Sequence, residues 1–164
     1  MDRISKENYY LDIAETVLER ATCLRRVYGA IIVKNDEIIS TGYNGAPRGR
    51  ANCVDMGFCT REAAKVPRGE RYELCRSVHA EANAIISASR RDMVGGTIYL
   101  VGRDARTGAL LNDATSCMMC RRMVINAGLE RVVIRRTEKE FEVVPVTAWI
   151  AEDDLMLPPT MDLK

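Results

Sequence analysis

The sequence predicts an α/β fold in which a mixed β-sheet carries helices on both faces. Segments with helical and strand character follow one another in the order α-β-β-α-β-α-β, a succession typical of helices that cover both sides of a sheet. Of the 164 residues, 47% are hydrophobic and 29% are charged, which is ordinary for a globular protein of this size. We therefore expect one domain over residues 1–164.

The first half of the chain predicts a helix, a hairpin and a long loop. Apolar side chains recur at helical spacing in residues 5–24, which indicates an amphipathic helix. In GAIIVKNDEIISTGYNG (29–45), two β-rich runs flank KNDE, a pattern typical of a β-hairpin. Residues 46–75 show no clear period, so we expect an ordered, cysteine-containing loop with a short helix near 60–65.

The second half predicts two helix–strand pairs and a short end segment. A helix over 79–91 precedes the strand TIYLVG (97–102), and a helix over 117–130 precedes the strand RVVIRR (131–136). The remaining expected elements are EFEVVPV as a further strand, TAWIAEDDL as a short helix capped by Thr147, and a loose tail over 155–164.

Charge and hydropathy argue against two classes of partner. The net charge is +1, so no global field attracts the chain to nucleic acid or to a membrane surface. The first residues, MDRISKENYY, lack the apolar core of a signal peptide, and no apolar run approaches the roughly 18–20 residues that cross a bilayer. We expect a cytoplasmic protein, in which cysteines serve more often as metal ligands or nucleophiles than in disulfides.

Two motifs at predicted helix starts carry the chemistry. Cys117 and Cys120 of CMMC lie on one helical face, and the positive end of the helix favours their thiolates. His79 is the only histidine of the chain and also stands at a helix start. If the two helices pack side by side on one face of the sheet, these three side chains meet as zinc ligands. They would leave a fourth position open for water, as catalytic zinc requires.

Glu81 then has a role beside the metal rather than on it. A carboxylate can take a proton from activated water and deliver it to a substrate nitrogen. Residues i and i+2 do not share a helical face, so this needs His79 in the first turn and Glu81 reaching over the metal from the side. Alone, a histidine before a helix is usually a cap or surface residue, and a C-x-x-C can be a redox pair. Together, H-x-E and C-x-x-C match the signature of zinc nucleobase deaminases.

Three segments resemble the deoxycytidylate (dCMP) deaminases of the cytidine deaminase superfamily: GAIIVKNDEIISTGYNGAPRG, VHAEANAI and CMMCRRMVINAGLERVVI. The resemblance runs over about residues 22–135. It implies a three-layer α-β-α, cytidine-deaminase-like fold with a five-stranded sheet. It also implies zinc-dependent hydrolysis of dCMP to dUMP and ammonia in pyrimidine nucleotide metabolism, by a homo-oligomer that is a dimer or hexamer.

The same resemblance assigns roles within the site. Activated water attacks C4 of cytosine, while Glu81 moves protons to N3 and to the leaving amine. The backbone amide of Ala80 holds the pyrimidine carbonyl, and Asn44 touches the sugar or phosphate. Arg25 matches a family arginine that meets the 5′-phosphate. Weaker phosphate candidates are Arg26, Arg48 and Arg50.

The chain also departs from the family pattern. Ser116 replaces the proline that usually precedes the first cysteine, which should cost rigidity but no ligand. Ile134 replaces a tyrosine that often ends this strand, and Glu138–Lys139 replaces a Tyr-Arg pair that reaches the nucleotide. The candidate replacements as phosphate contacts are Arg135, Arg136 and Lys139. These changes leave another cytosine nucleoside or nucleotide, or another aminated ring, open as substrate.

Four cysteines lie outside the trio. Cys23 and Cys53 resemble ligands of a second, structural zinc in a subgroup of the family. With Cys59 and Cys75, four thiolates would make a closed tetrahedral site that pins the long loop. The alternatives are buried cysteines that act as small hydrophobes, or two disulfides. The resemblance further implies dCTP and dTTP as effectors, with Mg²⁺ assisting.

Three other functions compete with dCMP deamination. Deaminases of bases within RNA or DNA commonly have a basic face and stacking aromatics, whereas this chain is 5% aromatic with a net charge of +1. The GYNG segment argues against a pyrimidine deaminase of the riboflavin pathway. A non-catalytic, zinc-stabilised interaction module has no use for Glu81 beside an open metal position.

Overall fold

The computed structural model describes residues 1–155, so the expected loose tail lies outside this range except for Leu155, which ends the last helix. The strands are β1 (Arg26–Lys34), β2 (Glu37–Tyr43), β3 (Thr97–Asp104), β4 (Arg131–Arg135) and β5 (Phe141–Pro145). The helices are α1 (Lys6–Leu18), α2 (Cys53–Met56), α3 (Thr60–Ala63), α4 (Ala80–Ile86), α5 (Arg90–Met93), α6 (Met118–Asn126) and α7 (Val146–Leu155), with a 3-10 turn η1 (Tyr72–Leu74). Within residues 1–155, these helices are too short or too polar to cross a membrane.

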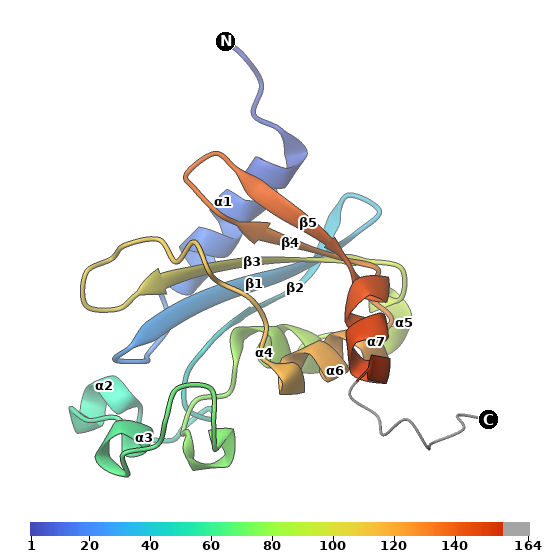
Figure 1. Ribbon diagram of the computed structural model, residues 1–164. Coiled ribbons are helices and arrows are strands. Elements are labelled where there is room, and N and C mark those ends of the chain that lie inside the picture. The colour runs from blue at the N-terminus through green and yellow to red at the C-terminus, as the bar shows by residue number, and fades with distance from the viewer. Residues whose placement is uncertain (156–164) are drawn as a thin grey trace.

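The strands form one mixed sheet in the order β2-β1-β3-β4-β5 (Figure 1). β1 runs antiparallel to both β2 and β3, β3 runs parallel to β4, and β4 runs antiparallel to β5. The turn between β1 and β2 holds Asn35 and Asp36 at φ values of 51° and 63°, a left-handed conformation that these residues tolerate in hairpins. The expected mixed five-stranded sheet and the hairpin at KNDE are confirmed.

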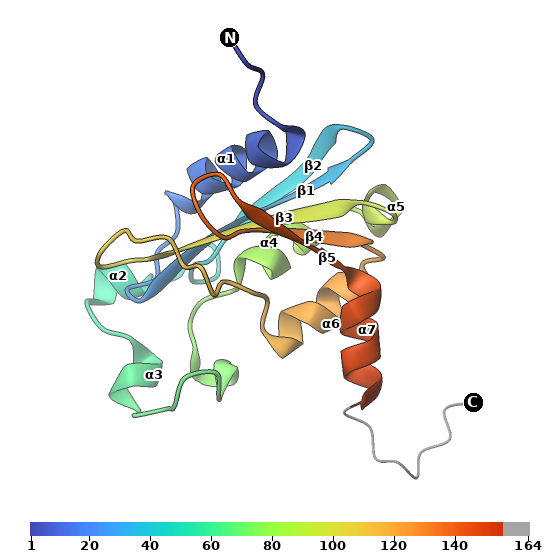
Figure 2. The ribbon, with the colours of Figure 1, turned by 45° about the horizontal axis from the view of Figure 1, so that its top comes forward.

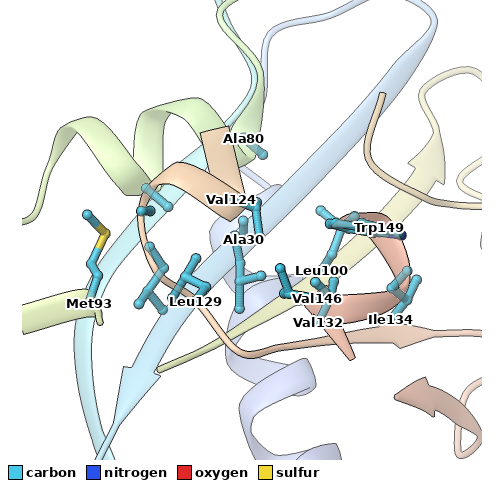
Figure 3. Close-up of a cluster of buried hydrophobic side chains, with 14 of the residues drawn as sticks. Ala30, Ala80, Met93, Leu100, Val124, Leu129, Val132, Ile134, Val146 and Trp149 are labelled. Carbon is cyan, nitrogen blue, oxygen red and sulfur yellow. The ribbon is translucent and has the colours of Figure 1, made fainter. Parts of the chain in front are cut away.

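Helices cover both faces of this sheet. α1 lies across one face, and α4, α6 and α7 lie on the other (Figure 1, Figure 2). Adjacent residues of β1 alternate between two cores, since Ala30 and Ile32 belong to the core under α4 and α6, whereas Ile31 belongs to the core under α1. The first core also contains Leu100, Val124, Val132, Ile134 and Trp149 (Figure 3). The expected three layers are therefore confirmed.

Two glycines let helices lie directly against the sheet. A Cβ on Gly42 of β2 would stand 2.2 Å from the carbonyl oxygen of Ala80 in α4. On the opposite face, a Cβ on Gly29 of β1 would stand 2.0 Å from the carbonyl oxygen of Ala14 in α1. Because no side chain separates β2 from α4 at this point, the sheet sets the position of the helix that His79 precedes.

Three expected helices have other ends in the structure, and the one expected over 117–130 is α6, which ends at Asn126. The helix expected over 5–24 ends at Leu18, because its last turn tightens into i→i−3 hydrogen bonds before the chain enters β1. The helix expected over 79–91 breaks at 87–89 into α4 and α5. This break lies in the sequence Ser-Ala-Ser, and serine side chains compete with the helical backbone for hydrogen bonds.

The long loop and the last helix also differ from expectation. Residues 46–75 contain α2, α3 and η1, of which only α3 matches the short helix expected near 60–65. Helices of three or four residues contain too few positions to show a period, so the sequence pattern missed the other two. Thr147 is not a cap, because α7 begins at Val146, directly after β5.

Candidate active site

His79 and Cys117 occupy the N-caps of two neighbouring helices. His79 precedes α4 and Cys117 precedes α6, and the two helices pack against each other under the sheet (Figure 1, Figure 2). The Nδ1 atom of His79 lies 3.5 Å from the Sγ atom of Cys117 and 3.4 Å from that of Cys120. The ligand atoms of all three residues lie within 4.8 Å of one another. The structure thus brings together the trio predicted from the sequence.

The donor set and its spacing fit a zinc ion. Zinc bonds of about 2.3 Å to sulfur and about 2.0 Å to nitrogen, at tetrahedral angles, place nitrogen and sulfur about 3.5 Å apart. The two distances from the His79 nitrogen to sulfur, 3.5 and 3.4 Å, are close to that value. Three protein ligands also leave one tetrahedral position free, the arrangement typical of catalytic rather than structural zinc.

Hydrogen bonds within the trio shift the pKa values of its two thiols in opposite directions. The Cys120 thiol donates to Cys117, which lowers the pKa of Cys117 to about 4 and raises the pKa of Cys120. The backbone N–H of Cys120, at the positive end of α6, also donates to the Cys117 Sγ at 3.4 Å. The hydrogen bond with Cys117 raises the pKa of His79. These contacts favour the thiolate form of Cys117, and the thiolate is the form that binds a metal.

Glu81 lies beside the trio in the first turn of α4 and is only 5% exposed. Burial raises the pKa of its carboxyl, and the Ser116 hydroxyl opposes this shift. His79 has the extended backbone angles of an N-cap, φ −70° and ψ 155°, so its side chain is not confined to helical directions. As a result, His79 and Glu81 line the same cavity despite their i, i+2 spacing. A buried carboxyl beside an open metal position is suited to carrying protons.

The cavity over the trio has a volume of about 240 Å³. Its polar lining includes Tyr28, Asn44, Tyr72, Asp113, Thr115 and Ser116. Its cationic lining consists of Arg25, Arg26, Arg61 and Arg68. Because guanidinium groups bind carboxylates and phosphates through charge-assisted hydrogen bonds, this lining suits a small anionic ligand.

The cavity also contains the two neutral groups predicted to bind substrate. The Asn44 amide accepts from the Tyr28 N–H at 2.8 Å and donates to the Arg26 carbonyl oxygen at 2.9 Å. These two bonds fix its orientation and leave one N–H and one lone pair for a ligand. Ala80 lines the cavity as the first residue of α4, a position at which a backbone N–H has no acceptor within the helix.

Arg25 lines the cavity as well, but it has an acidic partner. Its Nε lies 3.0 Å from the Glu62 carboxylate on α3. Asp113 is paired in the same way, at 3.0 Å from Arg68 and 3.9 Å from Arg26. Arg25, Arg26 and Arg68 are therefore held in place by carboxylates before any anion binds.

Sequence reasoning missed Arg61 and Tyr72, which form one wall of the cavity. Arg61 is 7% exposed and donates to the backbone oxygens of Pro67 and Glu70. Its guanidinium lies 4.7 Å from the centre of the Tyr72 ring, and that ring meets the His79 imidazole edge-on at 5.1 Å. The segment has no hydrophobic period, so only an unusually Arg-rich loop hinted at this role.

Five predicted phosphate contacts do not line the cavity, and two of them, Arg48 and Arg50, are exposed residues of the loop that follows β2. Arg135 is 1% exposed and pairs with Asp12 and Glu15 of α1, on the other face of the sheet. Arg136 pairs with Glu142 of β5 at 2.5 Å. Lys139 lies in the turn between β4 and β5. The predictions for Arg135 and Lys139 are wrong because both residues contact α1 on the other face of the sheet. Arg136 is engaged by Glu142 and by the carbonyl oxygens of Asn112 and Ala114 instead.

The four remaining cysteines lie near one another at the edge of the cavity. Burial raises the pKa of Cys53, and Cys23, Cys59 and Cys75 add to that shift. Within residues 1–155, no three of their sulfur atoms come within 4.8 Å of one another. None of the six cysteines forms a disulfide, so the disulfide alternative is wrong.

Comparisons with known proteins point to one family. The family described as "Cytidine and deoxycytidylate deaminase zinc-binding region" matches residues 4–136. Deoxycytidylate deaminase from Mycobacterium phage D29 is 35% identical over 138 residues, which cover 81% of this chain and 96% of that protein. The deoxycytidylate deaminase of Schizosaccharomyces pombe is 32% identical over 80% of this chain, which spans only 37% of that longer protein.

Solved structures agree with these sequence matches. The dCMP deaminase from cyanophage S-TIM5, determined in complex with dCMP and dUMP, is 25% identical with a TM-score of 0.57. The match covers 81% of this chain and 84% of that one. A cytidine deaminase from Burkholderia pseudomallei is 20% identical with a TM-score of 0.57, over 88% and 95% of the two chains, and shares the fold.

Proposed function

The chain belongs to the family of zinc-binding cytidine and deoxycytidylate deaminases, and we propose that it hydrolyses dCMP to dUMP and ammonia in pyrimidine nucleotide metabolism. One observation carries the proposal: the buried Glu81 carboxyl lies beside the open side of the His79–Cys117–Cys120 trio. The cyanophage deaminase that binds dCMP and dUMP supports the choice of nucleotide.

The residues of the site have separate roles in this reaction, namely metal binding and proton transfer. His79, Cys117 and Cys120 would hold zinc, whose Lewis acidity makes water a nucleophile near neutral pH. Glu81 accepts the proton that water loses and delivers it to N3 of cytosine. Glu81 then carries the second proton of the water to the amine that leaves C4, so that dCMP and water yield dUMP and ammonia.

Neutral groups orient the nucleoside part of the substrate. The Ala80 backbone N–H donates to the pyrimidine carbonyl oxygen, because it has no acceptor within α4. The Asn44 amide hydrogen-bonds to the sugar or phosphate with the N–H that its bonds to β1 leave free. Both groups are held by regular secondary structure, so the ring is presented to Glu81 at little entropic cost.

Arg25 is the proposed contact of the 5′-phosphate. Its guanidinium lines the cavity, and Glu62 holds it in position through Nε, which leaves the terminal nitrogens for phosphate oxygens. The pairing also favours a second candidate, deamination of another cytosine nucleoside or nucleotide. Glu62 and Asp113 offset much of the positive charge of Arg25, Arg26 and Arg68, which weakens the preference for a dianionic ligand.

Several further features stay predictions. A second zinc on Cys23, Cys53, Cys59 and Cys75 would require their sulfur atoms to draw closer, and their shared neighbourhood supports it. Regulation by dCTP and dTTP with Mg²⁺, and assembly into a dimer or hexamer, follow from the family resemblance alone. A cytoplasmic location stays a prediction from the sequence.

The test is a comparison of wild type with Glu81→Gln. We expect Glu81→Gln to keep the fold and the zinc content but to lose about 10²–10⁴-fold in ammonia release from dCMP, because the amide cannot accept a proton. Glu37→Gln, the same change at an exposed site on β2, is the matched control and should behave like wild type. Cytidine, CMP, dCMP and dCTP are compared as substrates. Undiminished turnover in Glu81→Gln contradicts the proposal, and a wild type that prefers cytidine contradicts the phosphate contact.

A further inference from the structure

Ser116 carries a buried hydroxyl that the mechanism above does not use. The residue stands directly before Cys117, is 2% exposed and lines the active-site cavity. Its Oγ has no hydrogen-bond partner within residues 1–155. Because buried polar groups in folded proteins are nearly always hydrogen-bonded, this hydroxyl destabilises the fold unless another state of the protein gives it a partner.

The backbone of Ser116 is held rigidly although the family proline is absent. The Arg121 Nε on α6 donates to the Ser116 carbonyl oxygen at 3.1 Å. The Arg121 guanidinium lies 4.9 Å from the centre of the Trp149 ring on α7 and pairs with Glu152 at 2.5 Å. Arg121 therefore supplies the rigidity that serine was expected to cost. It leaves the Ser116 hydroxyl at a defined place in the cavity wall.

This hydroxyl lies in the wall of the same cavity as the Glu81 carboxyl, and both residues are buried. The Ser116 hydroxyl also favours the ionised form of Glu81 and so opposes the rise in its pKa that burial causes. The Cys120 thiol also lies close to this carboxyl, but it belongs to the metal trio. Catalytic hydrogen bonds are often long in a free enzyme and tighten only when the substrate is bound.

We propose that Ser116 is a positioning residue for Glu81, to which its hydroxyl donates a hydrogen bond when the substrate fills the cavity. The bond holds one carboxylate oxygen, so that the other is aimed at the water proton. This inference rests on the proposed deaminase function. Ser116 is a position at which the chain departs from the family pattern. The inference gives its hydroxyl a role there, whereas the sequence predicted only a loss of rigidity.

The experiment compares Ser116→Ala, Ser116→Thr and Ser116→Pro with wild type, using dCMP and the zinc-loaded protein. In Ser116→Ala we expect kcat to fall about 10-fold at unchanged KM and zinc content, because one hydrogen bond to a charged group is lost. Ser116→Thr retains a hydroxyl and should recover much of kcat. Ser116→Pro stiffens the turn but has no hydroxyl, so it should resemble Ser116→Ala.

A matched control and a binding measurement separate positioning from structure. Ser40→Ala removes another buried hydroxyl, one that donates to the Ala84 carbonyl oxygen at 2.7 Å, and should lower the melting temperature without changing kcat. Ser116→Ala should also weaken binding of a pyrimidine nucleotide hydrated at C4, which Glu81 must contact, by about the same factor as kcat. Binding of dUMP should stay unchanged.

Three outcomes overturn the inference, and they differ from failure of the proposed function. If Ser116→Ala has the kcat of wild type, the hydroxyl has no role in positioning Glu81. Equal weakening of the hydrated analogue and of dUMP indicates a general change of the cavity, as does a loss of kcat in Ser116→Thr as large as that in Ser116→Ala. If instead wild type releases no ammonia from any cytosine nucleotide, or Glu81→Gln stays active, the proposed function itself fails and the inference fails with it.

Discussion

The His79 Nδ1 atom lies 3.4 Å from the Cys120 Sγ atom, although these residues belong to the starts of two different helices. This short distance between His79 and Cys120 depends on α4 and α6 packing against each other on one face of the sheet. Both helices direct their positive ends toward this point, which favours thiolates there.

The metal trio predicts the zinc content of cysteine variants. Cys120→Ala removes one ligand, so we expect the loss of one zinc per chain and of dCMP deamination. Cys53→Ala should retain the trio zinc and activity, because Cys53 lies outside this cluster. Elemental analysis of purified protein measures both. If the trio zinc and activity survive in Cys120→Ala, the trio is not the catalytic metal site.

Metal removal should also lower stability. A ligand that binds only the folded state at about 1,000 times its dissociation constant stabilises by about 4 kcal/mol. Thermal unfolding with and without a chelator measures this effect. Wild type should lose stability on chelation, whereas Cys120→Ala should lose little, unless the four-cysteine site also holds zinc. A comparison with Cys53→Ala separates the two contributions.

The close packing of Gly42 against α4 predicts a selective defect. Gly42→Ala places a Cβ 2.2 Å from the Ala80 carbonyl oxygen, so α4 must shift together with His79 and Glu81. We expect a loss of about 1–3 kcal/mol in stability and a lower zinc content. Gly29→Ala creates the same conflict with α1 on the other face and is the matched control. It should cost similar stability but leave the zinc content unchanged, and equal zinc loss in both variants would disprove the argument.

The Arg25–Glu62 pair predicts opposite effects on affinity. Arg25→Gln should raise KM for dCMP about 10–100-fold, since a charge-assisted contact with phosphate is lost, but should not affect deoxycytidine. Glu62→Gln leaves the guanidinium without its carboxylate partner and should lower KM for dCMP, most clearly at low salt.

Arg106 provides the control for this pair. It also reaches Glu62, at 3.6 Å, but it does not line the active-site cavity. Steady-state kinetics of Arg106→Gln should resemble those of wild type. If Arg25→Gln impairs deoxycytidine as strongly as dCMP, Arg25 supports the cavity wall rather than the phosphate.

The hydrogen bond between Tyr10 and Asp36 predicts that the folded protein loses stability at alkaline pH. Its hydroxyl donates to the Asp36 carboxylate at 2.6 Å, which raises the pKa of Tyr10 to about 12. Because the unfolded chain has a tyrosine pKa of about 10, this contribution is complete below pH 10 and is lost as the pH rises toward 12. Tyr10→Phe should be less stable by about 1 kcal/mol at pH 7, and the difference from wild type should shrink above pH 10.

Urea unfolding at several pH values measures this difference. Tyr9→Phe is the control, because Tyr9 is 50% exposed and should contribute little. A constant difference between wild type and Tyr10→Phe from pH 7 to 12 would rule out the titration of Tyr10 as its cause.

Much of the fold could be predicted from the sequence because it depends on local residue patterns. The hairpin at KNDE follows from two residues that tolerate positive φ between β-rich runs. The strands at 97–102 and 131–136 are apolar runs bounded by glycine or charge. The break at 87–89 and the helices in 46–75 were missed, since short elements are decided by tertiary contacts that leave no period in the sequence.

The sequence by itself determined which side chains make up the candidate site. A histidine two residues before a glutamate, and two cysteines three residues apart, have donor atoms and spacings that few other functions require. Only the tertiary structure decided that α4 and α6 lie side by side, that Arg61 and Tyr72 form a cavity wall, and that Arg135 faces α1. The reason is physical: ligand chemistry belongs to individual side chains, whereas the direction in which a side chain points depends on strand pairing and burial between distant segments.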